Sequence, residues 1–168
     1  MVIFNNDRTD VLVLEIKEGY SDIKSVRMLF DEYATSLGID LGVDLAFQDY
    51  EKELASLPGK YAKPAGMLYL AFWNGELAGC AAFRPFANDV CEMKRLFVRE
   101  KFRNCKIGAA LVEKLVKDAE DCGYHAMLLD TLSSMKAAKG LYERYGFKET
   151  TAYYHNPIVD AVYYKLVF

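Results

Sequence analysis

Three strand-like runs joined by tight turns lie in the middle of the chain, and they constrain the fold more than any other feature. The runs cover residues 67–73, 76–86 and 90–98. Asn74-Gly75 separates the first two runs and is a strong signal for a two-residue hairpin turn. Asn88-Asp89 offers the second turn. Strands with such short connections pair antiparallel, so we predict an antiparallel meander at the centre of the protein.

Helical and strand-like patterns flank this meander on both sides. Before it we predict a strand over residues 11–16, a helix that Ser21 caps and Gly38 ends, and a second helix from about Asp44 to Pro58. After it, the expected order is helix, strand, helix and two strands, over residues 107–121, 125–130, 134–145, 147–151 and 161–168. This order predicts a mixed α/β (α+β) fold, with a sheet that is antiparallel early and parallel around the helix at 107–121.

The composition fits one globular domain over residues 1–168. Apolar residues make up 52% of the chain and charged residues 27%, the balance expected of a soluble protein with a buried core. The net charge of −3 argues against general nucleic-acid binding, which needs a broad basic face. No repeat, low-complexity tract or linker suggests a second domain.

The use of cysteine and histidine argues against a metal site. Cys80, Cys91, Cys105 and Cys122 form no CxxC pair, and the chain has only two histidines. The first ten residues lack the apolar run of a signal peptide, and no stretch reaches the roughly 18 apolar residues of a membrane span. We therefore expect a cytoplasmic protein with reduced thiols, without a metal and without a membrane partner.

A short basic segment connects the third strand of the meander to the following helix. Residues 99–106 hold four basic side chains and one acidic side chain, a local charge of +3. Free backbone N–H groups and the positive end of the helix dipole meet at such a helix start, and this geometry binds phosphate. The alternative interpretation is a solvated charged loop without a ligand.

This segment resembles the pyrophosphate loop of the GNAT N-acetyltransferase superfamily, whose pattern Arg/Gln-x-x-Gly-x-Gly/Ala precedes a helix. Arg103 matches the first position and Gly108 the last, whereas Lys106 replaces the middle glycine. The preceding strand, residues 91–98, looks like the central strand of the family.

A second resemblance to the same family lies near the C-terminus. Residues 141–147, Leu-Tyr-Glu-Arg-Tyr-Gly-Phe, resemble the family signature Leu-Tyr-x-x-x-Gly-Phe. Met135 stands where the family usually has asparagine, which removes one expected side-chain hydrogen bond. Together the matching segments span residues 66–168.

The resemblance implies the GNAT acyl-CoA N-acyltransferase fold, in which a mostly antiparallel central sheet with helices on both faces splays around coenzyme A. Acetyl-CoA would be the co-substrate, with its pantetheine arm along the backbone of Leu96, Phe97 and Val98. Its pyrophosphate would lie on Arg103, Asn104, Cys105, Lys106, Ile107, Gly108 and Ala109. We expect Lys106 to have helical dihedral angles near the helix start, to point outward and to add charge. The alternative is weakened CoA binding.

The resemblance also suggests catalytic residues. Tyr142 matches the general acid of the family, which would protonate the departing thiolate, and a phenol keeps its proton at pH 7. The alternative is a buried core tyrosine, and Tyr145 lies near the same helix face. Glu92 is the expected general base, directly or through a water, because burial in an apolar strand would raise its pKa. The alternative for Glu92 is an ion pair with Arg84.

Polar side chains from several segments are expected around the acceptor. They are Tyr33, Arg84, Asp130, Thr131, Tyr154 and Asn156. Tyr61 also lies in a region where family members build substrate walls. For each residue alone, ordinary packing is the alternative. Lys94 and Arg95 are unusual in a central strand, and we expect them to pair with Asp130 or Glu92 or to contact an acidic acceptor.

These features predict an N-acetyltransferase that moves an acetyl group from acetyl-CoA to an amine. The acceptor is expected to be a small molecule, because the chain shows no protein-docking extension. A catalytically weak CoA-binding or sensor module is the alternative, favoured by the loss of the loop glycine. The aromatic last strand, residues 163–168, could form a homodimer contact or pack inward.

Overall fold

The computed structural model describes residues 2–4, 11–41, 45 and 49–168. The strands are β1 (Val2–Phe4), β2 (Val11–Glu18), β3 (Met67–Trp73), β4 (Glu76–Ala87), β5 (Val90–Val98), β6 (Ala126–Leu132), β7 (Lys148–Thr150) and β8 (Ala161–Val167). The helices are α1 (Ile23–Leu41), α2 (Tyr50–Ser56), α3 (Ile107–Asp121) and α4 (Lys136–Arg144). Short 3₁₀ turns are η1 (Gly19–Ser21), η3 (Gly59–Tyr61) and η4 (Glu100–Phe102).

The strands of the described residues form one eight-stranded sheet in the order β1-β2-β3-β4-β5-β6-β8-β7. All neighbours pair antiparallel except β5 and β6, which are parallel. A parallel pair needs a crossover connection, and α3 provides it. The predicted mixed sheet, antiparallel early and parallel around the third helix, is therefore confirmed.

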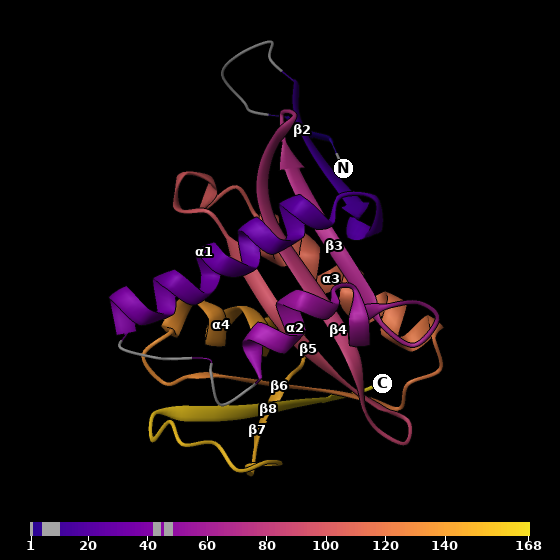
Figure 1. Ribbon diagram of the computed structural model, residues 1–168, viewed down its shortest axis with the longest axis vertical. Coiled ribbons are helices and arrows are strands. Elements are labelled where there is room, and N and C mark those ends of the chain that lie inside the picture. The colour runs from indigo at the N-terminus through magenta and orange to yellow at the C-terminus, as the bar shows by residue number, and fades with distance from the viewer. Residues whose placement is uncertain (1, 5–10, 42–44, 46–48) are drawn as a thin grey trace.

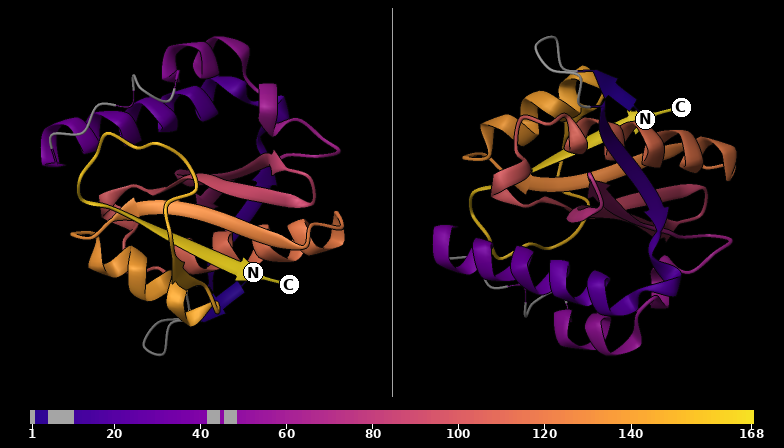
Figure 2. Two further views of the ribbon diagram at one scale, coloured as in Figure 1. Left: turned by 90° about the horizontal axis from the view of Figure 1, so that it is seen from below. Right: turned by 90° about the horizontal axis from the view of Figure 1, so that it is seen from above.

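Helices cover both faces of this sheet, as predicted. α1 and α2 lie on one face, and α3 and α4 lie on the other (Figures 1 and 2). Each face has its own apolar core. Beneath α1, the side chains of Leu29 and Phe30 pack with Leu68, and all three are fully buried. Beneath α3, Leu111 and Leu115 are fully buried in a second cluster.

The central meander follows the predicted turns. Trp73 pairs with Glu76 across a two-residue turn, and positive φ angles at Asn74 (49°) and Gly75 (80°) fit this turn. Ala87 pairs with Val90 across the second turn.

Several details of the secondary structure differ from prediction. Asp22, not Ser21, caps α1, since its Oδ1 accepts the Ser25 N–H at 3.1 Å while Ser21 ends η1. α1 continues through Gly38 to Leu41. β6 continues to Leu132 and α4 begins later, at Lys136. β1 has no counterpart among the predicted strands. The predicted start of the second helix at position 44 lies outside the described residues, and α2 begins at Tyr50.

No helix among the described residues is long and apolar enough to cross a membrane. Within the same ranges, no three His, Cys, Asp or Glu side chains cluster closely enough to hold a metal ion. The four cysteines are free thiols, with Cys80 and Cys91 buried.

Candidate active site

A cleft opens where β5 and β6 separate. The two strands pair in register only from Val90–Ala126 to Glu92–Leu128, although both continue beyond this point. The cleft encloses about 750 Å³, open solvent included. Its walls come from β5, β6, α1 and α4, and its lining includes Tyr33, Leu37, Leu45, Met93, Lys94, Arg95, Leu96, Leu129, Asp130, Thr131, Leu132, Met135, Ala138, Tyr142 and Ile158.

A β-bulge in β5 shapes this wall. Cys80 pairs with Phe97 and Ala82 pairs with Lys94, so two residues of β5 oppose one residue of β4. Arg95 lies in the bulge with a φ of 59°, a left-handed conformation that is uncommon for a residue other than glycine. The extra residue shifts the alternation of side chains, so those that follow the bulge point to the opposite face of the sheet from the one that regular pairing would give them.

The opposite end of this wall is held by a close approach of β4 and β5. A Cβ atom at Gly79 would lie 2.5 Å from the carbonyl oxygen of Phe97. Only glycine therefore fits at this position without moving the strand.

The bulge directs Arg95 toward α2. Its guanidinium donates two hydrogen bonds to Glu53, from Nε at 2.8 Å and from Nη2 at 3.1 Å. The Arg95 side chain is 2% exposed, and a bidentate contact of this kind satisfies a buried charge. The prediction that Arg95 pairs with Asp130 or Glu92 was therefore wrong, because the bulge turns the side chain to the α2 face.

Lys94 forms the charged floor of the cleft. Its Nζ lies 3.6 Å from Glu92 Oε1 and 3.5 Å from Asp130 Oδ1. The side chain is only 6% exposed, and burial of an unpaired ammonium would be unfavourable. The two carboxylates offset this desolvation cost. For Lys94 the predicted pairing with Asp130 and Glu92 is present.

Glu92 lies behind this floor rather than on the surface of the cleft. The residue is 1% exposed. Its Oε2 accepts a hydrogen bond from Arg84 Nε at 2.9 Å and lies 2.9 Å from Arg84 Nη2, and its Oε1 accepts the Tyr153 hydroxyl at 2.9 Å. The ion pair with Arg84, which the sequence left open as an alternative, is thus present. The pKa of Arg84 is raised despite burial, because Glu92 favours its charged form.

Asp130 is the carboxylate that lines the cleft itself. The Tyr154 hydroxyl donates to Asp130 Oδ2 at 2.9 Å. Asn156 Nδ2 lies 2.9 Å from the Tyr154 hydroxyl and 3.5 Å from the same Asp130 oxygen. Tyr154 and Asn156 therefore hold Asp130 from the loop before β8, and neither lines the cleft.

Tyr142 projects into the cleft from α4. It is 6% exposed, and its ring packs against Phe147 and Tyr164. Among the described residues, none forms a hydrogen bond with its hydroxyl. Burial raises the pKa of Tyr142, so the phenol keeps its proton across the physiological range.

Two other tyrosines lie near Tyr142, and only one of them lines the cleft. Burial raises the pKa of Tyr33, on the α1 wall of the cleft, to about 12. Tyr145, the C-cap residue that follows α4, does not line the cleft.

The first turn of α3 presents free backbone donors next to this cleft. α3 begins at Ile107, and its first helical hydrogen bond runs from the Ala110 N–H to the Lys106 carbonyl at 3.1 Å. The N–H groups of Ile107, Gly108 and Ala109 precede that bond and point out of the helix end. A Cβ atom at Gly108 would lie 3.5 Å from Leu141 of α4 and 3.8 Å from Val98 of β5, so this turn adjoins both walls.

The expected backbone conformation of Lys106 was wrong. Lys106 is the N-cap of α3 with φ 59° and ψ 14°, in the left-handed region and not in the helical region. This is the conformation that glycine adopts most readily, which gives a physical reason for the glycine in the family pattern. The Lys106 side chain is exposed, as expected, and Arg103 is exposed and lies 3.8 Å from Glu100.

The structure brings together only part of the predicted site. Five predicted residues line the cleft: Tyr33, Leu96, Asp130, Thr131 and Tyr142. Glu92, Tyr154 and Asn156 lie behind it, and Arg84 lines a different cavity. Phe97 packs against the Tyr33 ring at 5.9 Å outside the lining. The lining residues from the end of α1, such as Leu37, and from the loop before β8, such as Ile158, carried no signal that sequence reasoning could detect.

Comparisons with known proteins identify the family. A family model described as the acetyltransferase (GNAT) family matches residues 26–147. A protein of Schizosaccharomyces pombe named as an uncharacterised N-acetyltransferase is 42% identical over 147 residues, covering 86% of this chain and 88% of that protein. A second protein named as an uncharacterised N-acetyltransferase, from Dictyostelium discoideum, is 31% identical. The alignment covers 87% of this chain and 94% of that protein.

A solved structure gives the same result for the fold. PaiA N-acetyltransferase from Thermoplasma acidophilum, in complex with coenzyme A, is similar to this chain with a TM-score of 0.72 at 16% identity. The similarity covers 93% of this chain and 99% of that one. The family match spans well over half of the sequence, and this chain therefore belongs to the GNAT acetyltransferase family.

Proposed function

We propose that this acetyltransferase moves an acetyl group from acetyl-CoA to the amine of a small molecule. The observation that carries the proposal is the cleft between β5 and β6, which has Tyr142 in its wall and the free N–H groups of α3 beside it. The free thiols agree with a reducing compartment, and we propose the cytoplasm.

The residues present fit coenzyme A. The N–H groups of Ile107, Gly108 and Ala109 would hold the pyrophosphate, helped by the helix dipole and by the charges of Arg103 and Lys106. Beyond Glu92, the backbone of β5 has no β6 partner, so the strand from Met93 to Val98 can bond to the amide groups of the pantetheine arm. Bound acetyl-CoA supplies the thioester that is the acyl donor.

The reaction needs a neutral amine, a group that takes its proton and a group that protonates sulfur. The amine nitrogen attacks the thioester carbonyl carbon, and the carbon–sulfur bond breaks as the amide forms. Tyr142 donates its proton to the departing sulfur. Because burial raises the pKa of Tyr142, the phenol is protonated and available at neutral pH.

Two carboxylates are candidates for the proton acceptor. Glu92 is the candidate from the sequence, but Arg84 and Tyr153 already occupy its oxygens and it is 1% exposed. Asp130 lines the cleft, and this favours it as the group nearer to the amine. Lys94 lies between them, so Glu92 would act indirectly, by balancing the charge of Lys94.

A test combines cofactor binding with one catalytic variant. We expect acetyl-CoA to bind with micromolar affinity in calorimetry, and ATP to bind much more weakly. In a screen of small amines that detects free thiol, Tyr142→Phe should lower kcat by about 100-fold. Acetyl-CoA affinity and thermal stability should stay unchanged, because the Tyr142 hydroxyl forms no hydrogen bond within the described structure.

Tyr145→Phe, at the C-cap of α4 and outside the cleft, is the matched control and should keep normal kcat. Tight acetyl-CoA binding without transfer to any amine would favour the alternative function, a CoA-binding sensor. Full activity in Tyr142→Phe would remove this tyrosine from the mechanism.

A further inference from the structure

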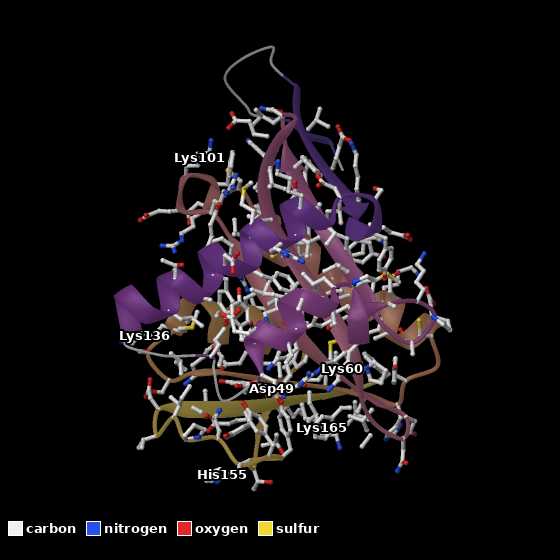
Figure 3. All side chains as sticks on the ribbon, in the orientation of Figure 1. Asp49, Lys60, Lys101, Lys136, His155 and Lys165 are labelled. Atoms are coloured by element: carbon white, nitrogen blue, oxygen red, sulfur yellow. The ribbon has the colours of Figure 1, made fainter. Side chains whose placement is uncertain are left out.

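A second cavity lies under α2, on the same face of the sheet as α1. It is lined by α2, the turn η3 and Arg84 of β4, and it encloses about 580 Å³, open solvent included. None of its lining residues lines the first cleft. Figure 3 labels two of them, Asp49 and Lys60, close together below α2.

An unsatisfied hydroxyl belongs to the wall of this cavity. Tyr61 is 1% exposed, and the edge-on contact with Phe30 at 6.0 Å fixes its ring. Its hydroxyl forms no hydrogen bond in the described structure, although the Glu53 carboxylate lies near enough to raise its pKa further after burial has done so. A buried polar group without a hydrogen-bond partner lowers the stability of the folded protein. We therefore expect such a group to serve a function or to bind a ligand.

Two further side chains of this lining, Lys60 and Arg84, offer donors. Lys60 is exposed and has no ion pair in the part of the chain that the structure describes. Arg84 contacts Glu92 through Nε and Nη2 and offers Nη1.

The acids of the lining already have partners. Both carboxylate oxygens of Glu53 accept from Arg95, and Asp49 lies 3.2 Å from Lys52. The three free donors around one cavity therefore suit a ligand that only accepts hydrogen bonds and carries negative charge.

We propose that this cavity binds a carboxylate, with the Tyr61 hydroxyl, the Lys60 ammonium and the Arg84 guanidinium as its donors. Two ion-pair connections link the site to the catalytic cleft. One is Glu53–Arg95, in which Arg95 lines the cleft. The other runs from Arg84 through Glu92 to Lys94 in the cleft floor.

This link allows two sources for the carboxylate. It can be the far end of the amine acceptor, which rests on the proposed function, or a separate small acid that changes the charge balance of the cleft floor.

Direct binding tests the site without any need for turnover. Succinate, acetate and inorganic phosphate are titrated into the full chain by calorimetry and by NMR of the protein. We expect saturable millimolar binding of the carboxylates. Tyr61→Phe and Lys60→Gln should each weaken it by about tenfold, the loss of one good hydrogen bond to a charged ligand. Tyr145→Phe and Lys117→Gln, a tyrosine and a lysine outside the cavity, should bind as the unaltered protein does.

Thermal stability gives a second readout, because Tyr61→Phe should weaken carboxylate binding but raise the Tm of the protein without ligand. Without ligand, Tyr61→Phe removes an unsatisfied hydroxyl and keeps the ring, so Tm should rise by about 2–4 °C. Succinate should raise the Tm of the unaltered protein and leave that of Tyr61→Phe nearly unchanged. A purely structural role of the hydroxyl predicts a lower Tm for Tyr61→Phe, and that result would overturn the proposal.

Kinetics separate the two sources. If the carboxylate belongs to the acceptor, Tyr61→Phe raises KM about tenfold for carboxylate-bearing amines and leaves carboxylate-free amines unaffected. If it is a separate ligand, added succinate changes kcat/KM for every amine, and Tyr61→Phe abolishes that effect.

Several outcomes reject the site. Absence of carboxylate binding in a protein that binds acetyl-CoA normally would reject it while leaving the proposed function intact. Phosphate binding without carboxylate binding would reject the carboxylate assignment.

Discussion

At the scale of single residues, the two carboxylates beside Lys94 differ in their exposure to the cleft, because Glu92 is buried and Asp130 is only partly buried. Glu92 sits in a closed set of contacts with Arg84, Tyr153 and Lys94. Asp130 shares Lys94 with it but also faces the cleft. We therefore expect Glu92 to contribute mainly to the stability of the sheet, and Asp130 to act in the proposed reaction.

Paired substitutions test this division. Glu92→Gln removes one partner of a buried ion pair and should lower the free energy of unfolding by about 3 kcal/mol. Asp130→Asn should lower it by only about 1 kcal/mol, yet reduce kcat about 100-fold. Urea unfolding and steady-state kinetics at a temperature where all variants are folded measure both effects.

Asp121→Asn, an exposed carboxylate of α3, is the control for both measurements. The reverse pattern, with activity lost in Glu92→Gln and kept in Asp130→Asn, would return the role of general base to Glu92.

At the scale of elements, the start of α3 combines a useful electrostatic field with backbone strain. Lys106 places a positive charge at the start of the helix, where we propose that the pyrophosphate binds, but in a left-handed conformation that disfavours any residue with a Cβ atom. The two effects can be separated by substituting Lys106 with glycine and with alanine, since both remove the charge and only alanine keeps the strain.

We expect Lys106→Gly to be more stable than Lys106→Ala by about 1 kcal/mol in urea unfolding. Both variants should bind acetyl-CoA more weakly than the unaltered protein at low salt, because both lose a charge near the diphosphate. If Lys106→Gly instead bound acetyl-CoA more tightly, the lysine would obstruct the loop, as the departure from the family pattern first suggested.

At the scale of the whole molecule, partly buried tyrosines couple stability to alkaline pH. Burial raises the pKa of both Tyr20 and Tyr33 to about 12, whereas in an unfolded chain both ionise near 10. Between these values the unfolded state has released protons that the folded state still holds. The stability that these two tyrosines contribute is therefore complete below pH 10 and is lost as the pH rises toward 12.

Calorimetry from pH 8 to pH 11 should show a Tm that declines slightly from about pH 9, because burial raises the pKa of the Cys80 and Cys91 thiols, and more steeply above pH 10. Tyrosinate absorbance should rise together with unfolding rather than before it. If these tyrosines titrated near pH 10 without any change in Tm, they would be accessible to solvent in the folded protein.

Local sequence determined most of the elements of this protein and one part of its site. The Asn74-Gly75 turn, the helical spacing of α3 and the basic segment before it depend on neighbouring residues, so they could be predicted from the chain alone. Tyr142 could be found for the same reason, since its signature is contiguous.

Only the tertiary structure decided the rest, because it depends on contacts between segments far apart in the sequence. The bulge at Arg95 arises from the register between β4 and β5, and it alone sends that side chain to Glu53 on α2. The separation of β5 from β6 makes Asp130 part of the cleft and leaves Glu92 behind it. The cavity beside Tyr61 likewise exists because α2 and η3 meet β4, a contact that no local pattern encodes.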